Sequence, residues 1–461
     1  MSPDRIEEIV GLSKRRGFGY PSAEIYSDSA PAGDGVEVFA SAWDLGPLGV
    51  ELKENIKRQW WKSCVRGRED VVGMESAVIA APALWQVPQR LEQRRISLTQ
   101  CQVCRQRVRV GPASSEAGRA LSDVRCPHCG STGTFGEPQV LDSAVQARLA
   151  LPGGQQAVHF LRPDPIQGIL VNFANVMRSS RRQPPFGIAQ IGRSFRNSMA
   201  TDQLFRTHEF EQMGLAYFVP PGTDAGWHRY WIEQRWNWYL DLGLPEQDLR
   251  QVEQDVDPRA GGVARATDIE FRFGLAHAQW GKLEGLANRN DADMLAHSRA
   301  TGVDLSCHDQ QSGLRWTPYV ISPTAGLSRC LLAFLVAALS EDFAPDAGGV
   351  ARPRTVLRLD HRLAPVKVAV LPLSRNPELS PAARGLASRL RRDWTVEFDD
   401  SGAIGRRYRR QDEIGTPFCV TLDFAGMADN TVTVRERDTM KQDRVSLGRL
   451  HGYLAEHLAG C

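Results

Sequence analysis

Apolar positions recur at two different spacings along the chain, and these spacings predict where helices and strands lie. Between Leu48 and Lys62 they recur every three or four residues, which predicts one long amphipathic helix near Pro47. The uninterrupted apolar run from Cys330 to Leu339 is too short to cross a membrane, which takes roughly 18 residues. This run therefore predicts a buried helix.

Two strand-like stretches in the middle of the chain predict a hairpin. The first runs from Phe186 to Arg196 and the second from Arg206 to Phe218, and a polar segment separates them. Further on, the Pro- and Gly-bearing stretch 344–353 precedes a strand-like segment. We expect a domain boundary near residue 350, followed by a compact α/β domain, because strand and helix patterns alternate beyond that point.

Length and composition narrow the class of protein. The 461 residues are too many for one ordinary core and predict two to four domains. Hydrophobic residues at 42% and charged residues at 24% exclude a disordered or collagen-like chain. The 56 basic and 54 acidic residues nearly cancel, which excludes a histone-like binder and limits nucleic-acid contact to local patches. The N-terminal residues lack the apolar stretch of a secretory signal, so we expect a cytoplasmic protein that does not span a membrane.

Four of the nine cysteines form two close pairs. Cys101 and Cys104 form one CxxC pair, Cys126 and Cys129 form the other, and residues 105–125 separate them. Two such pairs place four thiolates around one Zn²⁺ ion, so the spacing predicts a zinc site. Reduced surface cysteines and a redox-active pair are the alternatives.

Two arginines near the predicted hairpin and the buried helix form a second candidate site. Arg196 ends the first hairpin strand, and Arg329 begins the helix. Guanidinium groups that converge bind a polyphosphate in a bidentate manner, and an aromatic such as Phe210 stacks on a base. The alternative is that each arginine is a solvated or salt-bridged surface residue. Spacing alone does not decide between these interpretations.

Several long motifs resemble one family. They begin with Trp43-Asp-Leu-Gly-Pro-Leu-Gly-Val-Glu and include Asp400-Ser-Gly-Ala-Ile-Gly-Arg-Arg-Tyr-Arg-Arg-Gln-Asp-Glu-Ile-Gly-Thr-Pro-Phe418. The other matching segments are 68–72, 171–173, 178–181, 185–192, 283–289 and 429–440. In these segments the chain closely resembles the glycyl-tRNA synthetase family of the dimeric class II type, from about residue 15 to residue 456.

The resemblance implies an α+β fold. Its parts are a class II synthetase antiparallel sheet with flanking helices, a zinc-ribbon-like insertion and a C-terminal α/β anticodon-binding domain. The implied limits are 1–350 for the catalytic domain, 90–136 for the zinc-binding insertion within it, and 351–461 for the anticodon-binding domain. The long helix, which contains Leu52 and Ile56, would build a homodimer interface.

The resemblance also implies an ATP site. Arg196 would bind the α-phosphate, Phe210 would lie against adenine, and Arg329 would lie on the γ-phosphate side. These two catalytic arginines would stabilise charge as an amino-acid carboxylate attacks the α-phosphorus. The implied ATP-binding residues are Arg196, Asn197, Ser198, Phe205, Phe210, Lys282, Leu283, Gly326 and Arg329.

The amino acid and the tRNA have implied sites of their own. The amino-acid pocket would consist of Arg109, Asp164, Gln212, Gly214, Ser322 and Thr324. The tRNA would contact the basic run Arg406, Arg407, Tyr408, Arg409 and Arg410, where the aromatic stacks on an unpaired base and the arginines meet phosphates.

The chain departs from the family pattern within these sites. Asp164 stands in place of a longer glutamate, and Ser198, Gly214 and Ser322 stand where the family has glutamates. Lys282 stands where a metal-coordinating glutamate is expected. Each lost carboxylate removes a charge-assisted hydrogen bond of about 1.5–3 kcal/mol to an ammonium. A lysine beside the phosphates would act as counter-charge, so a reduced metal site is expected.

The main interpretation is a glycine–tRNA ligase type of aminoacyl-tRNA synthetase. Its cofactors would be ATP, Mg²⁺ and Zn²⁺, and its partners glycine tRNA, an amino acid and a second copy of the chain. One alternative is a diverged paralogue that binds glycine tRNA but activates another amino acid or serves a tRNA-dependent biosynthetic pathway. Another is a non-catalytic tRNA-binding protein. Retention of Arg196, Phe210 and Arg329 favours an enzyme that uses ATP.

Overall fold

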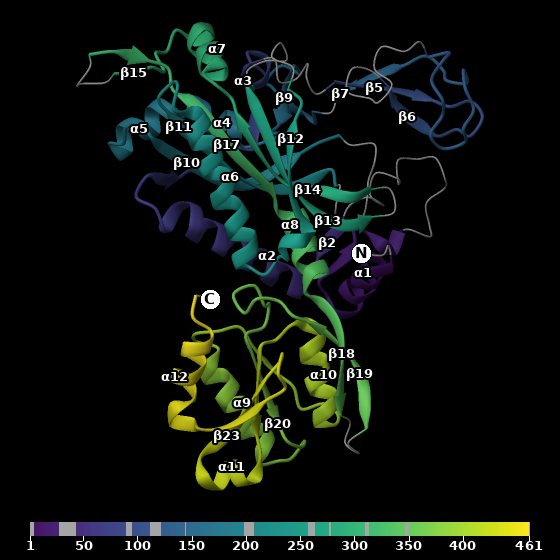
Figure 1. The fold of residues 1–461 in the computed structure, drawn as a ribbon, viewed down its shortest axis with the longest axis vertical. Helices are drawn as coiled ribbons and strands as arrows, with labels where there is room; N and C mark the ends of the chain where they lie inside the picture. Colours follow the sequence, from purple (N-terminus) through teal and green to yellow (C-terminus); the bar gives the residue numbers. More distant parts are fainter. Residues whose placement is uncertain are drawn as a thin grey trace.

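The computed structural model describes residues 4–26, 43–88, 95–110, 121–142, 144–197, 207–256, 263–275, 278–308, 313–345 and 350–460. Its largest element is a seven-stranded sheet in the upper part of Figure 1. Strands β10 and β3 pair in parallel, and the other neighbours pair antiparallel. In spatial order the strands are β12 (Leu249–Gln254), β13 (Arg265–Leu275), β14 (Ala278–Asn288), β17 (Tyr319–Gly326), β11 (Glu209–Val219), β10 (Phe186–Phe195) and β3 (Val71–Gly73).

Helices pack against this sheet in two groups, each with its own hydrophobic core. The larger core takes in α1 (Asp4–Arg16), α2 (Pro47–Trp61), α6 (Asp224–Asp241) and α8 (Leu327–Ala338). The smaller core takes in α4 (Ile166–Val171), α5 (Phe173–Ser180) and α7 (Ala292–Thr301). Helix α4 contacts β10 and β11, so it lies against the part of the sheet between β17 and the edge strand β3.

Both predicted helices are confirmed. The apolar run forms most of α8, and its side chains are buried almost without exception, as a helix that is apolar all round requires. The amphipathic segment forms α2, which begins with Pro47 at its first turn, where a missing N–H costs nothing. Leu52 and Ile56 of α2 are fully buried within the chain, because this helix packs on α8.

The predicted hairpin is also confirmed. Strands β10 and β11 pair antiparallel over their length, from Phe186 opposite Phe218 to Phe195 opposite Glu209. Strand β11 then pairs with β17, the middle strand of the sheet, and β10 pairs with the edge strand β3. The loop that joins the two strands, 198–206, lies outside the described residues.

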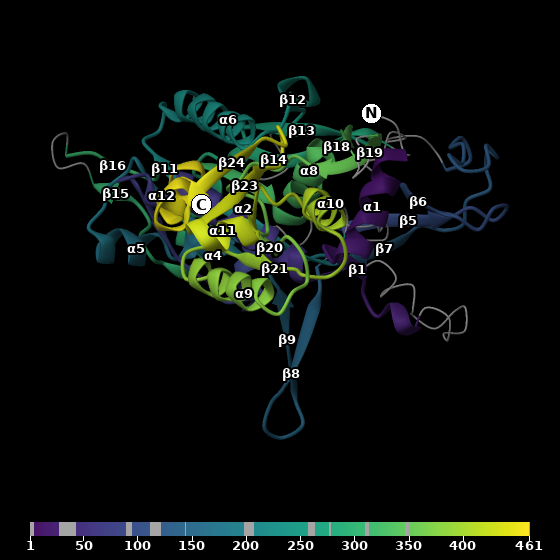
Figure 2. The same ribbon diagram turned by 90° about the horizontal axis from the view of Figure 1, so that it is seen from below.

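Two three-stranded sheets lie beside the main sheet. One contains β4 (Ile79–Ala80), β8 (Gln146–Ala150) and β9 (Gln156–Leu161), and its β8–β9 hairpin projects from the body in Figure 2. The other contains β5 (Arg95–Gln100), β6 (Arg107–Val110) and β7 (Gln139–Asp142); Cys101 and Cys104 follow β5, and Cys126 and Cys129 lie between β6 and β7. The remaining short elements include α3 (Ala83–Gln86), the pair β1 (Gly19–Pro21) and β2 (Trp43–Leu45), and the pair β15 (Cys307–His308) and β16 (Arg315–Trp316).

The C-terminal part has a sheet and a core of its own. Its strands, in spatial order, are β21 (Val396–Phe398), β20 (Val368–Pro372), β22 (Phe418–Leu422), β23 (Thr431–Glu436) and β24 (Gln442–Ser446). Helices α9 (Leu379–Leu390) and α12 (Leu447–His457) pack in its main core, and α10 (Ile404–Ile414) packs on a second cluster. The short helix α11 (Phe424–Asp429) precedes β23.

The two parts are joined by a hairpin and by side-chain contacts. Strands β18 (Leu339–Pro345) and β19 (Ala351–Leu357) form the hairpin, which runs down beside α10 in Figure 1. Arg16 of α1 forms an ion pair with Glu413 of α10. Asn55 of α2 donates hydrogen bonds to the carbonyls of Leu363 and Ala364 at 3.2 and 3.0 Å.

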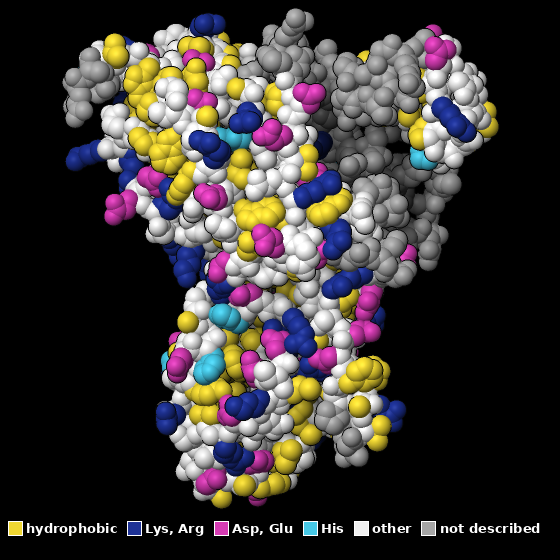
Figure 3. Space-filling view, in the orientation of Figure 1, with side chains coloured by type: hydrophobic (Ala, Val, Ile, Leu, Met, Phe, Trp, Pro, Cys, Tyr) yellow, Lys and Arg dark blue, Asp and Glu magenta, His cyan; other side chains and the backbone are white. Residues whose placement is uncertain are grey.

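Charged side chains of both signs are mixed on the face shown in Figure 3, as the balanced composition predicts. In the part of the chain that the structure describes, no helix combines the length and the apolar character that a membrane crossing needs.

Candidate functional site

A cavity of about 620 Å³ opens on the same face of the main sheet as the start of α4. Its walls come from β11, β13, β14 and β17, from the two residues after β10, from the start of α4 and from the first turn of α8. The structure brings together most of the residues predicted for the ATP site and the amino-acid pocket. Those that line the cavity are Asp164, Arg196, Asn197, Phe210, Gln212, Lys282, Leu283, Ser322, Thr324, Gly326 and Arg329.

Strand register explains this convergence. Gln212 of β11 lies opposite Gly326 of β17, and Thr324 of β17 lies between Gly214 of β11 and Gly285 of β14. Alternate residues of a strand face the same side, so these positions share one face although they are far apart in sequence. Three adjacent strands therefore form the floor of the cavity.

Arg196 and Phe210 lie next to each other at one side of the cavity. The guanidinium carbon of Arg196 lies 5.4 Å from the centre of the Phe210 ring, within the range of a cation–π contact. The backbone N–H of Arg196 donates to the carbonyl of His208 at 2.8 Å, which keeps the two hairpin strands paired at this point. The cavity wall therefore carries the Arg196 cation and the Phe210 ring side by side.

Arg329 and Lys282 lie next to each other in another part of the cavity wall. Arg329 Nη1 donates to the backbone carbonyl of Lys282 at 2.9 Å. Lys282 Nζ lies 2.7 Å from Oδ1 of Asp268, with 44% of the lysine side chain and 9% of the aspartate side chain exposed. Asp268 therefore lies beneath the ammonium, and the ammonium faces the cavity.

Asp164, Ser322 and Arg289 also line the cavity. Asp164 Oδ1 accepts a hydrogen bond from the N–H of Ile166 at 3.1 Å, which holds this carboxylate at the start of α4. Arg289 Nε donates to the Ser322 hydroxyl at 2.8 Å. A Cβ at Gly214 would lie 2.8 Å from Pro165 Cγ, so the sheet and α4 approach closely because this residue has no side chain.

Sequence reasoning missed several residues of the cavity. Asp268 and Arg289 are the charged ones, and the others are Ile166, Thr207, Ala266, Gly285, Leu286, Ala287 and Ser328. Arg289 is the last residue of segment 283–289, which resembles the family, and this resemblance could have indicated its place in the site. Asp268 carries no comparable signal, because only the pairing of β13 with β14 brings it under Lys282.

Four predicted residues are not among the lining residues. Ser198 and Phe205 lie outside the described residues. Arg109 lies on β6, where its backbone pairs with Leu98 in the sheet that carries the cysteines. Gly214 contributes to the cavity indirectly, through the close approach of α4.

The described lining does not fit a Mg²⁺ ion held by protein carboxylates. Such a site needs at least one free carboxylate next to the phosphates. Asp268 is in an ion pair with Lys282, and Asp164, at the start of α4, belongs to the predicted amino-acid pocket. The nearby Glu284 points to the other side of the sheet, where Arg235 Nε lies 3.0 Å from its Oε1.

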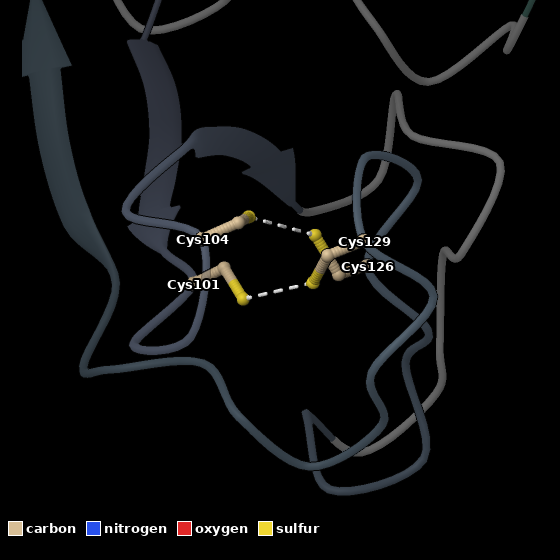
Figure 4. Close-up of side chains that lie close together, drawn as sticks. All are labelled: Cys101, Cys104, Cys126 and Cys129. Atoms are coloured by element: carbon tan, nitrogen blue, oxygen red, sulfur yellow. Dashed lines mark hydrogen bonds between the residues drawn. The ribbon is translucent and has the colours of Figure 1, made fainter.

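The four paired cysteines form a cluster that fits a metal ion. Their sulfur atoms all lie within 4.8 Å of one another, and Figure 4 shows the four side chains gathered between the two CxxC turns. The Sγ atoms of Cys101 and Cys129 lie 3.7 Å apart, and so do the Sγ atoms of Cys104 and Cys126. Hydrogen bonds from the backbone N–H of Cys104 and from the Thr134 hydroxyl lower the pKa of the Cys101 thiol. At Cys101 this favours the thiolate, which is the form that binds metals.

The predicted tRNA-binding run lies on α10, and its members face different environments. Arg406 is exposed. Arg407 is fully buried, donates to the carbonyls of Pro372 and Leu373, and has its pKa lowered by that burial. The remaining members are also engaged. Tyr408 hydrogen-bonds to Thr421 at 2.7 Å, Arg409 reaches the carbonyl of Pro353, and Arg410 pairs with Asp399.

Known proteins similar to this chain agree with this geometry. The anticodon binding domain family matches residues 367–457, which contain α10. The chain is 53% identical to the glycine–tRNA ligase of Streptomyces coelicolor, with 100% of both chains covered. It is 50% identical to the glycine–tRNA ligase of Thermobifida fusca, with 99% of both chains covered, and 48% identical to that of Cutibacterium acnes, with 100% and 98% covered. The chain belongs to the glycyl-tRNA synthetase family.

Membership of the glycyl-tRNA synthetase family supports the main interpretation of the sequence. The match extends over the whole chain, and it does not favour a diverged paralogue or a non-catalytic tRNA-binding protein. It implies ATP and Mg²⁺ as cofactors and tRNA and an amino acid as partners. The departures at Asp164, Gly214, Lys282 and Ser322 are therefore features of one member of the glycyl-tRNA synthetase family.

Proposed function

We propose that the chain is a glycine–tRNA ligase that activates glycine with ATP and transfers it to glycine tRNA. The observation that carries this proposal is the single cavity shared by Arg196, Phe210, Arg329 and Asp164 in a chain similar over its full length to glycine–tRNA ligases. The cavity offers an aromatic face for a base, cations for a polyphosphate and a carboxylate for an ammonium. These are the groups that the two substrates require.

The arginines act in the first step. A carboxylate oxygen of glycine attacks the α-phosphorus, the bond to the leaving pyrophosphate breaks, and glycyl-adenylate forms. Arg196 and Arg329 both line the cavity, so their charges offset the negative charge that spreads over the phosphates. In the second step a hydroxyl at the tRNA 3′ end attacks the glycyl carbonyl, and AMP leaves.

The pocket binds glycine through its ammonium. Asp164 supplies the carboxylate, and the amide of Gln212 and the hydroxyls of Ser322 and Thr324 line the same space. The close approach of Pro165 to Gly214 narrows the cavity there. The narrowed space disfavours amino acids with a larger side chain than that of glycine.

The architecture and assembly follow from the same assignment. The seven-stranded sheet is the class II catalytic core within 1–350, and 351–461 is the anticodon-binding domain. Two chains associate through the region of α2, and the protein acts in the cytoplasm. Leu52 and Ile56 are buried inside the chain, so the dimer contact uses the other side of α2, where Val50 is 40% exposed.

The cysteine cluster binds one zinc ion within the insertion 90–136. Cys101, Cys104, Cys126 and Cys129 hold it as thiolates, and the ion ties the two CxxC turns together. With four protein ligands the site has no open position for catalysis, so its role is structural.

Exposed arginines of α10 contact the tRNA. Arg406 is exposed, and Arg409 is half-buried at the same helix. Arg407 instead fixes the helix to the carbonyl ends of β20 and the residue after it. The basic run therefore combines phosphate contact with support of the domain.

The test is glycine-dependent exchange of pyrophosphate into ATP, with Arg329→Ala as the variant. Removing a group that stabilises transition-state charge lowers kcat by about 10²–10³. Arg299→Ala, which removes an exposed arginine of α7, is the matched control and should leave the exchange rate unchanged. An unchanged rate in Arg329→Ala would contradict the proposed role.

A further inference from the structure

We propose that Lys282 supplies, from the protein itself, the positive charge that a carboxylate-held Mg²⁺ ion would otherwise bring to the phosphates of ATP. The inference rests on the proposed use of ATP in this cavity. Three observations carry it: a bulge in β14, the lack of a side chain at Gly285, and the ion pair between Lys282 and Asp268.

The bulge turns Lys282 toward the cavity. The pairing of β14 with β13 shifts by one residue between Lys282 and Glu284, so Leu283 is an extra residue in β14. In a regular strand, residues two apart share a face, but a bulge reverses that relation. Glu284 is consequently buried against Arg235 on one side of the sheet, and Lys282 lines the cavity on the other.

Gly285 leaves the space that the ammonium occupies. A Cβ on this residue would lie 2.5 Å from Lys282 Nζ, closer than side-chain atoms approach one another. Any larger residue at this position would displace the ammonium from Asp268. The lysine and the glycine therefore form one arrangement that holds a cation at a fixed point of the cavity.

The electrostatic balance of the cavity agrees with an anionic ligand. Its described lining contains four basic residues, Arg196, Lys282, Arg289 and Arg329, and two acidic residues, Asp164 and Asp268. Arg329 donates to the carbonyl of Lys282, so these two cations belong to one wall. Asp268 keeps the ammonium in place while leaving 44% of the lysine side chain exposed.

A lysine and a divalent ion act differently on phosphates. Both lower the electrostatic cost of bringing a polyphosphate into the cavity, but the ammonium is part of the protein and needs no free metal. A wall that already holds this cation has little affinity for a second one, because like charges repel. ATP binding should therefore depend only weakly on Mg²⁺.

The experiment is calorimetric titration of the full-length protein with ATP, without amino acid or tRNA. It is done in buffer freed of divalent cations by a chelating resin and again with Mg²⁺ added. We expect the Kd of the unmodified protein to differ by less than about threefold between the two buffers. Lys282→Glu should weaken metal-free binding at least about tenfold, and added Mg²⁺ should restore part of the loss.

Three further variants make the result specific. Lys282→Arg keeps a cation and should keep metal-independent binding. Asp268→Asn releases the ammonium without removing it and should also keep that binding. Lys441→Glu makes the same change of charge at an exposed site in the C-terminal part and should leave the Kd unchanged. Thermal unfolding of each variant confirms that it is folded.

The outcomes separate this inference from the proposed function. Binding of ATP that weakens more than about tenfold without Mg²⁺ in the unmodified protein would overturn the role of Lys282. Unchanged metal-free binding by Lys282→Glu would overturn it as well. Failure to bind ATP in either buffer would instead overturn the proposed function.

Discussion

Arg235 and Glu284 form a buried ion pair directly behind the wall of the cavity, with Nε 3.0 Å from Oε1 and both side chains almost fully enclosed. The Tyr239 hydroxyl donates to the same carboxylate at 3.0 Å. The pair connects α6 to β14 next to Lys282 and Leu283, which line the cavity. Loss of this ion pair should therefore lower the stability of the protein and disturb the position of the cavity wall.

Removing one partner of this pair should destabilise the protein strongly. Arg235→Met leaves the Glu284 carboxylate buried without its counter-charge, which costs about 3–5 kcal/mol. Chemical denaturation measures the free energy of unfolding of the unmodified protein and of the Arg235→Met variant. The double variant Arg235→Met with Glu284→Leu removes both charges and should recover a large part of the loss. A double variant no more stable than the single one would show that the ion pair itself is not the cause.

Zinc content tests the cysteine cluster. Protein purified without chelator should contain one zinc ion per chain, and Cys101→Ser should lose it, because zinc needs all four thiolates for a closed tetrahedral site. Elemental analysis gives the metal content. The control is His128→Ala, an exposed residue between Cys126 and Cys129, which should retain the zinc. Absence of zinc from the unmodified protein would rule out this site.

A carboxylate at position 322 should strengthen glycine binding. Ser322 lines the cavity and receives a hydrogen bond from Arg289, so Ser322→Glu places a carboxylate beside an existing cation and within reach of the substrate ammonium. One charge-assisted hydrogen bond of about 1.5–3 kcal/mol lowers the KM for glycine about tenfold or more. Ser322→Gln has nearly the same shape without the charge. An equal change in both variants would show that charge is not the reason.

The contact between α2 and the hairpin predicts a pH dependence of stability. Burial alone would raise the pKa of the Glu211 carboxyl, but hydrogen bonds and charges from Lys53 and Lys57 outweigh it and lower that pKa below its ordinary value of 4.5. A carboxyl with a lowered pKa stabilises the folded state above the ordinary pKa, and this stabilisation is lost as the pH falls through the lowered pKa.

Glu211→Gln tests this dependence. The melting temperature of the unmodified protein should fall more steeply below about pH 4.5 than that of the variant, because the variant has no carboxylate to protonate. At neutral pH the variant should be the less stable of the two. Parallel pH profiles of the two proteins would contradict the assigned role of Lys53 and Lys57.

Much of the fold could be predicted from local patterns. The amphipathic spacing around Leu52 and the apolar run after Cys330 identified α2 and α8, because helix periodicity and burial are local properties of a sequence. The two CxxC pairs identified the cysteine cluster, since their spacing alone restricts where four thiolates can lie. The hairpin of β10 and β11 was predicted from strand-like runs on either side of a polar segment.

The rest depended on relations between distant strands. Asp268 entered the cavity through the register of β13 against β14, and the bulge at Leu283 decided which face Lys282 occupies. Neither feature leaves a periodic signal in the sequence. The position of Arg407 could not be predicted either. A basic run predicts side chains exposed to solvent, but Arg407 is buried and donates to the carbonyls of Pro372 and Leu373. These carbonyls belong to a distant segment of the chain.

The most direct test of the proposed function is pyrophosphate exchange measured with each proteinogenic amino acid in turn, followed by charging of glycine tRNA. We expect exchange with glycine, abolished by Arg196→Ala, and transfer of glycine to its tRNA. Exchange with a different amino acid and not with glycine, or exchange with none of them, would contradict the assignment of this chain as a glycine–tRNA ligase.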